Sequence, residues 1–121
     1  MDTPARSFRD LQIWQKSHAL ALDVYRASAG FPKAEQYGLA VQMQRAAVSI
    51  PANIAEGFGR SSRLEKRRFL NIAQGSLEEL RYYLILAEDL GYPVGQSLSI
   101  SVDEVGRMLE AYRRRISPAS P

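Results

Sequence analysis

The side chains with the clearest chemical potential lie in the segment "GRSSRLEKRRF", residues 59–69. Glu65 is its one acidic residue, against five cations. The cations are Arg60, Arg63, Lys66, Arg67 and Arg68. Basic residues at the start of a helix oppose the helix dipole, so they do not stabilise the helix itself. Since the N–H groups of a helix N-terminus also attract anions, the run indicates phosphate binding, with an ordinary solvated helix end as the alternative.

A second basic group, Arg113, Arg114 and Arg115, ends the last predicted helix, where positive charge suits the helix dipole. Neither basic group is interleaved with aromatic residues, and the chain contains no motif for reading bases. Any contact with RNA or DNA would therefore be made to the phosphate backbone.

A polar strip crosses the segment "RAAVSIPANIAEGFGR", residues 45–60. Four polar residues recur there about one helical turn apart, namely Arg45, Ser49, Asn53 and Glu56. They could bind a ligand or form a solvated face. We favour a structural network in a seam between helices, because apolar residues flank the strip. Glu79 of the next helix lies at the edge of an apolar arc, and Arg45 is its expected partner.

The sequence excludes several kinds of chemistry. It contains no Cys, which rules out disulfides, thiolate zinc sites and cysteine nucleophiles. The single histidine, His18, falls in an apolar arc without a matching nucleophile or carboxylate, so we expect it to be structural. No Gly-rich phosphate loop, paired-carboxylate motif or metal-ligand spacing is present. We predict a protein that is not an enzyme and has no metal site or cofactor.

Length and charge set broad limits. The chain has 121 residues, which predicts one domain with a real core. Its formal net charge of +3 permits a nucleic-acid partner without requiring one. No long apolar window or signal-peptide pattern is present, so we expect no membrane span and a cytoplasmic location.

Apolar residues recur with a helical period along nearly the whole chain, and no strand pattern of useful length appears. The predicted helices span 8–28, 37–57, 62–90 and 101–116. Pro51 predicts a kink in the second helix. The motifs "SRLE" and "SVDE" open the third and fourth helices as capping boxes, and Gly91 stops the third.

Short connections between these helices favour an all-α, antiparallel up-down four-helix bundle. The expected domain covers residues 8–116, with a flexible N-terminus at 1–7 and a disordered tail at 117–121.

The helices carry more apolar surface than a monomeric bundle would bury. The first helix has a main arc of Leu11, Trp14, His18, Ala21, Leu22 and Tyr25. Its second, narrower stripe consists of Ile13, Leu20 and Val24. The third helix places Tyr82 and Ile85 outside its main arc. Because surplus apolar surface marks interfaces, we expect a homo-oligomer.

Three segments resemble a known family: "FRDLQIWQKSHALALDVYRAS", "AVSIPANIAEGFGR" and "GSLEELRYYLILAEDLGY". Over about residues 8–112 the chain is similar to bacterial 23S rRNA intervening-sequence proteins. The resemblance implies an up-down bundle that assembles into a homopentameric barrel and has no catalytic residues. A related branch, the accessory variability proteins of diversity-generating retroelements, resembles this fold and assists a reverse transcriptase through a basic, nucleic-acid-binding surface.

Three functions stay open on the sequence. The leading hypothesis is a non-enzymatic homopentamer that binds RNA or DNA through phosphate contacts of the two basic groups. The alternative is a protein-interaction scaffold, for example accessory to a reverse transcriptase or another gene neighbour, with no direct nucleic-acid role. An enzyme or small-ligand protein that uses the 45–56 strip and Glu79 is the least favoured.

Overall fold

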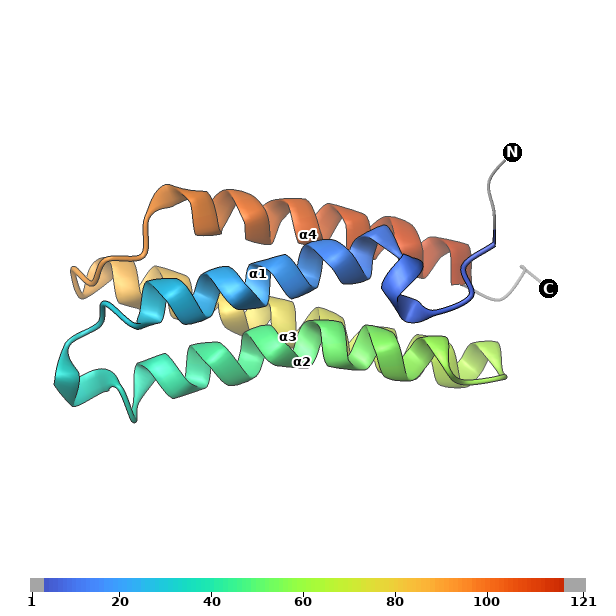
Figure 1. Cartoon of the computed structure of the whole chain (residues 1–121), viewed down its shortest axis with the longest axis horizontal. Helices are drawn as coiled ribbons and strands as arrows, with labels where there is room; N and C mark the ends of the chain where they lie inside the picture. The colour runs from blue at the N-terminus through green and yellow to red at the C-terminus, as the bar shows by residue number, and fades with distance from the viewer. Residues whose placement is uncertain (1–3, 117–121) are drawn as a thin grey trace.

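The computed structural model describes residues 4–116, which form four α-helices and two short 3₁₀ segments (Figure 1). In chain order these are η1 Phe8–Asp10, α1 Gln12–Ser28, η2 Lys33–Glu35, α2 Leu39–Phe58, α3 Arg63–Asp89 and α4 Gln96–Ile116. No strand occurs within these residues. Residues 1–3 of the expected flexible N-terminus and the expected tail at 117–121 lie outside the described residues.

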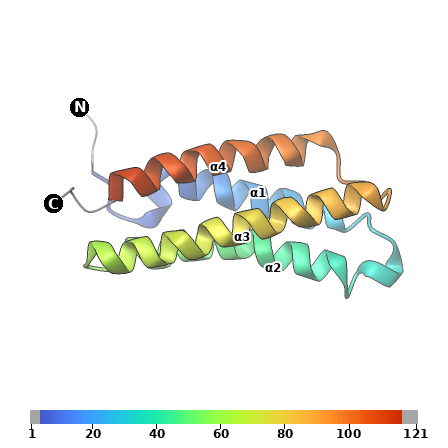
Figure 2. The same cartoon turned by 180° about the vertical axis from the view of Figure 1, so that it is seen from behind.

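The four helices lie lengthwise beside one another in an elongated bundle (Figures 1 and 2). Successive helices run in opposite directions because short connections join them. Helices α1 and α3 each pack against both α2 and α4, so the helices occupy the corners of a square in chain order. The prediction of an all-α four-helix bundle is confirmed.

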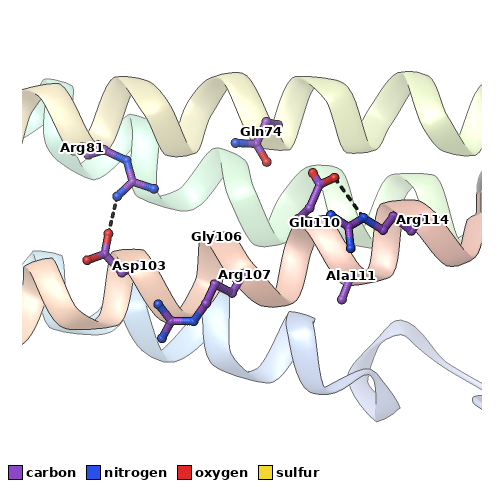
Figure 3. A pocket seen from close by; sticks show the side chains of 8 residues that line it. All are labelled: Gln74, Arg81, Asp103, Gly106, Arg107, Glu110, Ala111 and Arg114. Atoms are coloured by element: carbon purple, nitrogen blue, oxygen red, sulfur yellow. Dashed lines mark hydrogen bonds and ion pairs between the residues drawn. The ribbon is translucent and has the colours of Figure 1, made fainter.

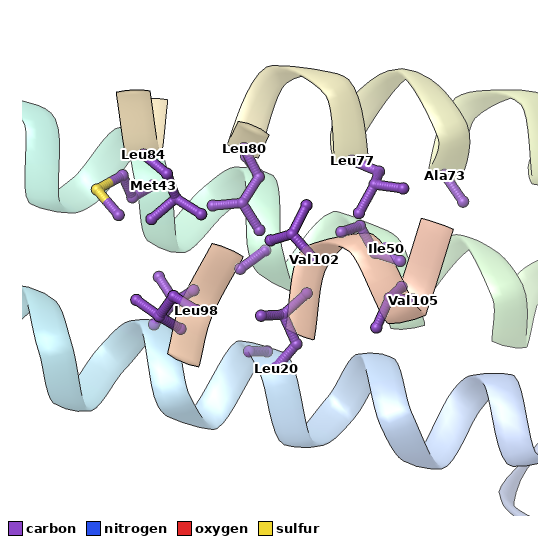
Figure 4. Packing of buried hydrophobic residues seen from close by; sticks show 14 of the residues in the cluster. Leu20, Met43, Ile50, Ala73, Leu77, Leu80, Leu84, Leu98, Val102 and Val105 are labelled. Atoms are coloured by element: carbon purple, nitrogen blue, oxygen red, sulfur yellow. The ribbon is translucent and has the colours of Figure 1, made fainter. Parts of the chain in front are cut away.

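One hydrophobic core runs along the centre of the bundle, and every helix contributes to it (Figure 4). Its members recur three or four residues apart, which is the period of one helix face. Fully buried examples from the four helices are Leu20, Met43, Ile50, Leu77, Leu80, Val102 and Val105. Burying a side chain of this size contributes about 1.5–3 kcal/mol, so the core holds the four helices in register.

The core side of α1 differs from the predicted one. Ile13, Leu20 and Val24 are buried, while Leu22 and Tyr25 of the predicted main arc are exposed. The reason is that small residues complete the buried stripe and let neighbouring helices approach. Two of them are serines, whose hydroxyl groups donate within the helix, Ser17 to Trp14 O at 3.0 Å and Ser28 to Tyr25 O at 3.2 Å.

His18 also lies on the exposed side of α1 rather than in the core. Its ring stacks on Trp14, with centroids 4.9 Å apart and planes inclined by 9°. The role of His18 in the structure is therefore to stack on Trp14 at the surface of the bundle.

The first predicted helix is broken at Leu11, whose backbone is extended at φ −77° and ψ 128°. The preceding η1 begins with a capping box, in which the Ser7 hydroxyl accepts from Arg9 N at 3.1 Å. The Asp10 carboxylate accepts from Ser7 N, also at 3.1 Å. Because the chain changes direction at Leu11, η1 does not continue the axis of α1 and instead packs against the end of α2.

Helix α4 begins at Gln96, five residues before the predicted start at 101. The predicted capping box at "SVDE" is wrong, since Ser101 lies inside the helix. Gly95 (φ 73°) allows the turn that precedes the helix, and Leu98 is buried one turn before Val102. Burial of Leu98 extends the helix beyond the local capping signal, as tertiary packing commonly does.

The other predicted helix ends agree better with the structure. The Ser62 hydroxyl accepts from Glu65 N at 3.1 Å and so caps the start of α3. Gly91 has φ 79° and follows the end of α3 in a Schellman motif, where Tyr92 N donates to Ala87 O at 2.9 Å. Helix α2 continues through Pro51, whose ring is buried.

Helices α2 and α3 approach closely near their connection. A Cβ atom built on Gly57 would lie 3.2 Å from Phe69 Cβ and 3.3 Å from Lys66 O. Gly75 in the middle of α3 is the opposite case, since a Cβ there would meet nothing within 4 Å.

These two glycines predict opposite effects of the same substitution. Gly57→Ala should lower the free energy of unfolding by about 1 kcal/mol or more, because it overpacks the contact. Gly75→Ala should raise it by about 0.5–1 kcal/mol, because alanine suits an exposed helix better. Urea denaturation of both variants measures the difference. Equal effects of the two substitutions would contradict the close approach at Gly57.

A hydrogen bond joins two connections at the other end of the bundle. Tyr92 in the α3–α4 connection donates its hydroxyl to Glu35 Oε2 of η2 at 2.7 Å. The Tyr92 ring also packs against Phe31, with centroids 5.3 Å apart. The hydrogen bond to Glu35, aided by burial, raises the pKa of Tyr92.

This raised pKa predicts a pH-dependent contribution to stability. The folded state favours the neutral phenol, so the contribution is complete below the ordinary pKa of about 10 and is lost as pH rises through the raised pKa. Tyr92→Phe should lower the melting temperature at neutral pH, and its difference from wild type should shrink above about pH 10. A difference that stays constant across this range would contradict a hydrogen-bonding role for the hydroxyl.

Candidate nucleic-acid interface

Antiparallel packing brings the two predicted basic groups to the same end of the bundle. The start of α3 and the last turns of α4 lie side by side there, as both views show (Figures 1 and 2). The two groups lie about 50 residues apart in the sequence, and they were predicted there as separate surfaces. The fold joins them into one surface, which we call the basic end.

A partly open pocket of about 180 Å³ lies at the basic end, and we call it the arginine pocket. Its lining residues are Arg67, Asn71, Glu110, Arg113 and Arg114. Three arginines and one glutamate thus line the same small pocket. By formal charge the lining carries three positive charges and one negative, so the pocket favours an anion.

Glu110 and Asn71 hold two of these arginines in place. Glu110 Oε2 accepts from Arg113 Nη1 at 3.1 Å, and its Oε1 lies 3.4 Å from Arg114 Nε. Arg113 Nη2 also donates to Asn71 Oδ1 at 2.7 Å. Because these bonds orient the guanidinium groups before any ligand arrives, less side-chain entropy is lost on binding. Glu110 and Asn71 were missed on the sequence, because their role depends on the packing of α4 against α3.

The remaining cations surround the pocket with different partners. Arg60 pairs with Glu56 at 3.0 Å and lies over the Phe69 ring, 4.8 Å from its centroid. Arg68 lies 3.7 Å from Glu65. Arg63 and Arg115 are exposed. These exposed pairs are worth little to stability, but their positive ends strengthen the field at the basic end.

A family model described as 23S rRNA-intervening sequence protein matches residues 9–111, which include α1, η2, α2 and α3, all but the first residue of η1 and most of α4. The chain belongs to this family. The family resemblance predicted from three sequence segments is confirmed. A search of curated proteins found no match.

The family match and the arginine pocket do not coincide. Arg67, Asn71 and Glu110 lie within the matched residues, whereas Arg113 and Arg114 follow residue 111. The pocket of this family member therefore depends on the last turns of α4 as well as on the matched region.

Lys66 differs from the other members of the basic run. Its Nζ donates to Phe58 O at 2.9 Å and to Gly57 O at 3.4 Å, two carbonyl groups at the C-terminus of α2. Nζ also lies 5.6 Å from the Phe58 ring centroid. A cation in this position caps a helix and suits its dipole. The structure therefore gives Lys66 a structural role in joining α3 to α2.

The predicted polar strip divides into a seam and a surface. Ser49 Oγ lies 2.7 Å from Ser76 Oγ of α3, and either hydroxyl can donate. Asn53 Nδ2 donates to Ser49 O at 2.8 Å and to Ser49 Oγ at 3.0 Å. Ser49 and Asn53 thus form a network between α2 and α3, as expected. Ser76 was not recognised as a member, although a polar residue within an apolar arc is a usable signal.

The other two strip residues, Arg45 and Glu56, and the predicted partner Glu79 lie outside this seam. Glu56 pairs with Arg60 on the surface. Arg45 and Glu79 are both exposed, and no ion pair joins them within the described residues, so the predicted pair is wrong for the single chain. Exposed charges are hydrated and need no partner, which removes the physical reason for the pair.

Glu79 acts instead on Tyr83 of the same helix. Burial raises the pKa of the Tyr83 hydroxyl group, and the nearby Glu79 carboxylate raises it further.

A longer and more open groove continues from the arginine pocket along α3 and α4 (Figure 3). Its volume is about 510 Å³, and it shares Glu110 and Arg114 with the pocket. Arg81 of α3 is paired there with Asp103 of α4. Cations and carboxylates nearly balance in this groove, so it is a weaker anion site than the arginine pocket.

Residues 4–116 lack two further features, a metal cluster and a membrane-spanning helix. No group of three acidic or histidine side chains is placed to hold a metal ion. Nor does that part of the chain contain a helix with the length and hydropathy needed to cross a bilayer.

The Lys66 cap predicts a loss of stability on removal of its charge. Lys66→Met should lower the free energy of unfolding by about 1 kcal/mol, because the two α2 carbonyls lose their donor. The matched substitution Arg68→Met, at an exposed cation of the same helix, should change it by less than about 0.5 kcal/mol. Denaturant titrations of both variants test this, and equal losses would contradict a capping role for Lys66.

Proposed function

We propose that this family member is a non-enzymatic, homopentameric bundle protein that binds RNA or DNA non-specifically through phosphate contacts at its basic end. The observation that carries the proposal is the convergence of Arg67, Arg113 and Arg114 in one pocket. Three guanidinium groups around a small space suit a phosphate, because each can present two parallel N–H donors to its oxygens.

The chemistry of the pocket supports binding rather than catalysis. Its one carboxylate, Glu110, is engaged by two guanidinium groups of the same pocket. No Ser, Thr, Tyr, Lys or His lines the pocket. The lining can hold an anion, but it contains no nucleophile to attack one.

Phosphate contacts would make binding insensitive to sequence. Such contacts position a nucleic acid but carry no information about its bases. Exposed cations around the pocket, Arg63, Arg68 and Arg115, would extend the contact along a backbone. Non-specific binding with a strong salt dependence is the expected behaviour.

Exposed apolar residues support the homopentamer. Leu22 and Tyr25 on α1 and Val48 on α2 are all more than 40 % exposed in the single chain. Apolar residues in such numbers favour contact with further copies. Assembly would repeat the arginine pocket five times and raise the avidity for a long polyanion.

A protein-interaction scaffold, for example accessory to a reverse transcriptase, is the second candidate. Tyr82 and Ile85 support it, since they are 57 % and 53 % exposed on α3. Large apolar side chains that stay exposed after assembly would suit a protein partner better than a phosphate backbone.

The binding proposal is tested by fluorescence anisotropy with labelled RNA and DNA over about 50–200 mM salt. The double variant Arg67→Gln/Arg114→Gln should weaken binding about tenfold or more at low salt, because two phosphate contacts are lost. On a single strand, the slope of log affinity against log salt should fall by about 1.4.

The matched control is Arg26→Gln/Lys33→Gln, which removes the same charge at the opposite end of the bundle (Figure 1). It should bind like wild type, apart from a small effect of net charge. Native mass spectrometry of the same samples reports the number of copies. Absent binding at low salt, or equal losses in both double variants, would contradict the proposal.

A further inference from the structure

A second pocket adjoins the arginine pocket on the outer side of α3. Its volume is about 490 Å³, and its lining residues are Leu64, Arg67, Arg68, Asn71 and Ile72. Arg67 and Asn71 line both pockets, so the two are neighbours on the surface. A polymer with a phosphate in one of them can place its adjoining nucleotides at the other.

The second pocket differs from the first in having two exposed apolar side chains. Leu64 is 71 % exposed and Ile72 is 45 % exposed. They are eight residues apart in α3, so they lie about two turns apart along the helix. Arg67 and Arg68 lie between them in sequence. The surface thus presents aliphatic side chains directly beside guanidinium groups.

This combination selects among polyanions. A duplex presents phosphates and sugars outward and stacks its base faces inside, so it would leave Leu64 and Ile72 without an apolar partner. A single strand can turn an unpaired base outward within one nucleotide of a phosphate. Every base has a face of the same kind, so apolar contact with that face does not distinguish one base from another, which agrees with non-specific binding.

We infer that the preferred ligand is single-stranded RNA or DNA, with a phosphate in the arginine pocket and unpaired bases against Leu64 and Ile72. This inference rests on the proposed function and adds the strand state of the ligand. Charge favours this ligand over a second copy of the chain as the occupant of the pocket. The chain carries a formal net charge of +3, and Arg67 and Arg68 in the pocket favour an anionic occupant.

The test compares a single-stranded oligonucleotide of about 16 nucleotides with a duplex of the same sequence, by anisotropy at one salt concentration. Wild type should bind the single strand about tenfold more tightly or better. Leu64→Ser/Ile72→Ser should lower the affinity for the single strand about tenfold and leave that for the duplex unchanged.

The matched control is Tyr82→Ser/Ile85→Ser, which removes two exposed apolar side chains from the same helix outside the pocket. This variant should keep the preference for single strands. Circular dichroism of both variants checks whether they keep the fold of wild type, and native mass spectrometry checks whether they keep its assembly.

Four outcomes would overturn the inference. Equal or tighter binding of the duplex by wild type would exclude a single-strand preference, while the proposed function would stand. Equal losses for both ligands in Leu64→Ser/Ile72→Ser would exclude base contact. A changed assembly mass in that variant would identify the face as a subunit contact. Binding of neither ligand by wild type, with binding of an acidic amphipathic peptide instead, would overturn the proposed function as well.

Discussion

The close contact of α2 with α3 near their connection is the constraint on which the basic end depends. Gly57 leaves room for Phe69 and the Lys66 backbone, and the Lys66 ammonium group caps the α2 carbonyls. Together these contacts set where α3 begins and in which direction it runs. Because a helix is a rigid rod, these contacts also set the position and direction of the α3 surface against which α4 packs. Arg67 therefore lines one pocket with Arg113 and Arg114.

The basic end shows how a protein keeps many like charges close together. Glu110 contacts Arg113 and Arg114, Glu56 contacts Arg60, and Glu65 contacts Arg68. Each carboxylate reduces repulsion among the cations and restricts the motion of a long side chain. The surface remains positive because the arginines outnumber the acids. Stability and anion binding are thus compatible, since the carboxylates orient the guanidinium groups without neutralising them all.

Sequence reasoning succeeded where a local signal and tertiary packing agree. The Ser62 cap, the Gly91 stop and the helical period of α3 all predicted elements that the structure contains. It failed where packing overrides a local signal. The motif "SVDE" has the form of a capping box, but burial of Leu98 carries α4 back to Gln96. On α1 the bulkier stripe indicated the core, while the stripe with Ser17 and Ser28 is buried because small side chains allow close helices.

The sequence by itself determined the helical class of this protein, its approximate helix bounds, its family and the identity of its cations. Those properties depend on residue types and short spacings, which the chain carries locally. The tertiary structure alone decided that the two basic groups share one pocket, that Lys66 is a helix cap, and that Arg45 and Glu79 stay apart. These outcomes depend on how α2, α3 and α4 pack against one another. The sequence pattern of one helix does not specify which residues of another helix will face it.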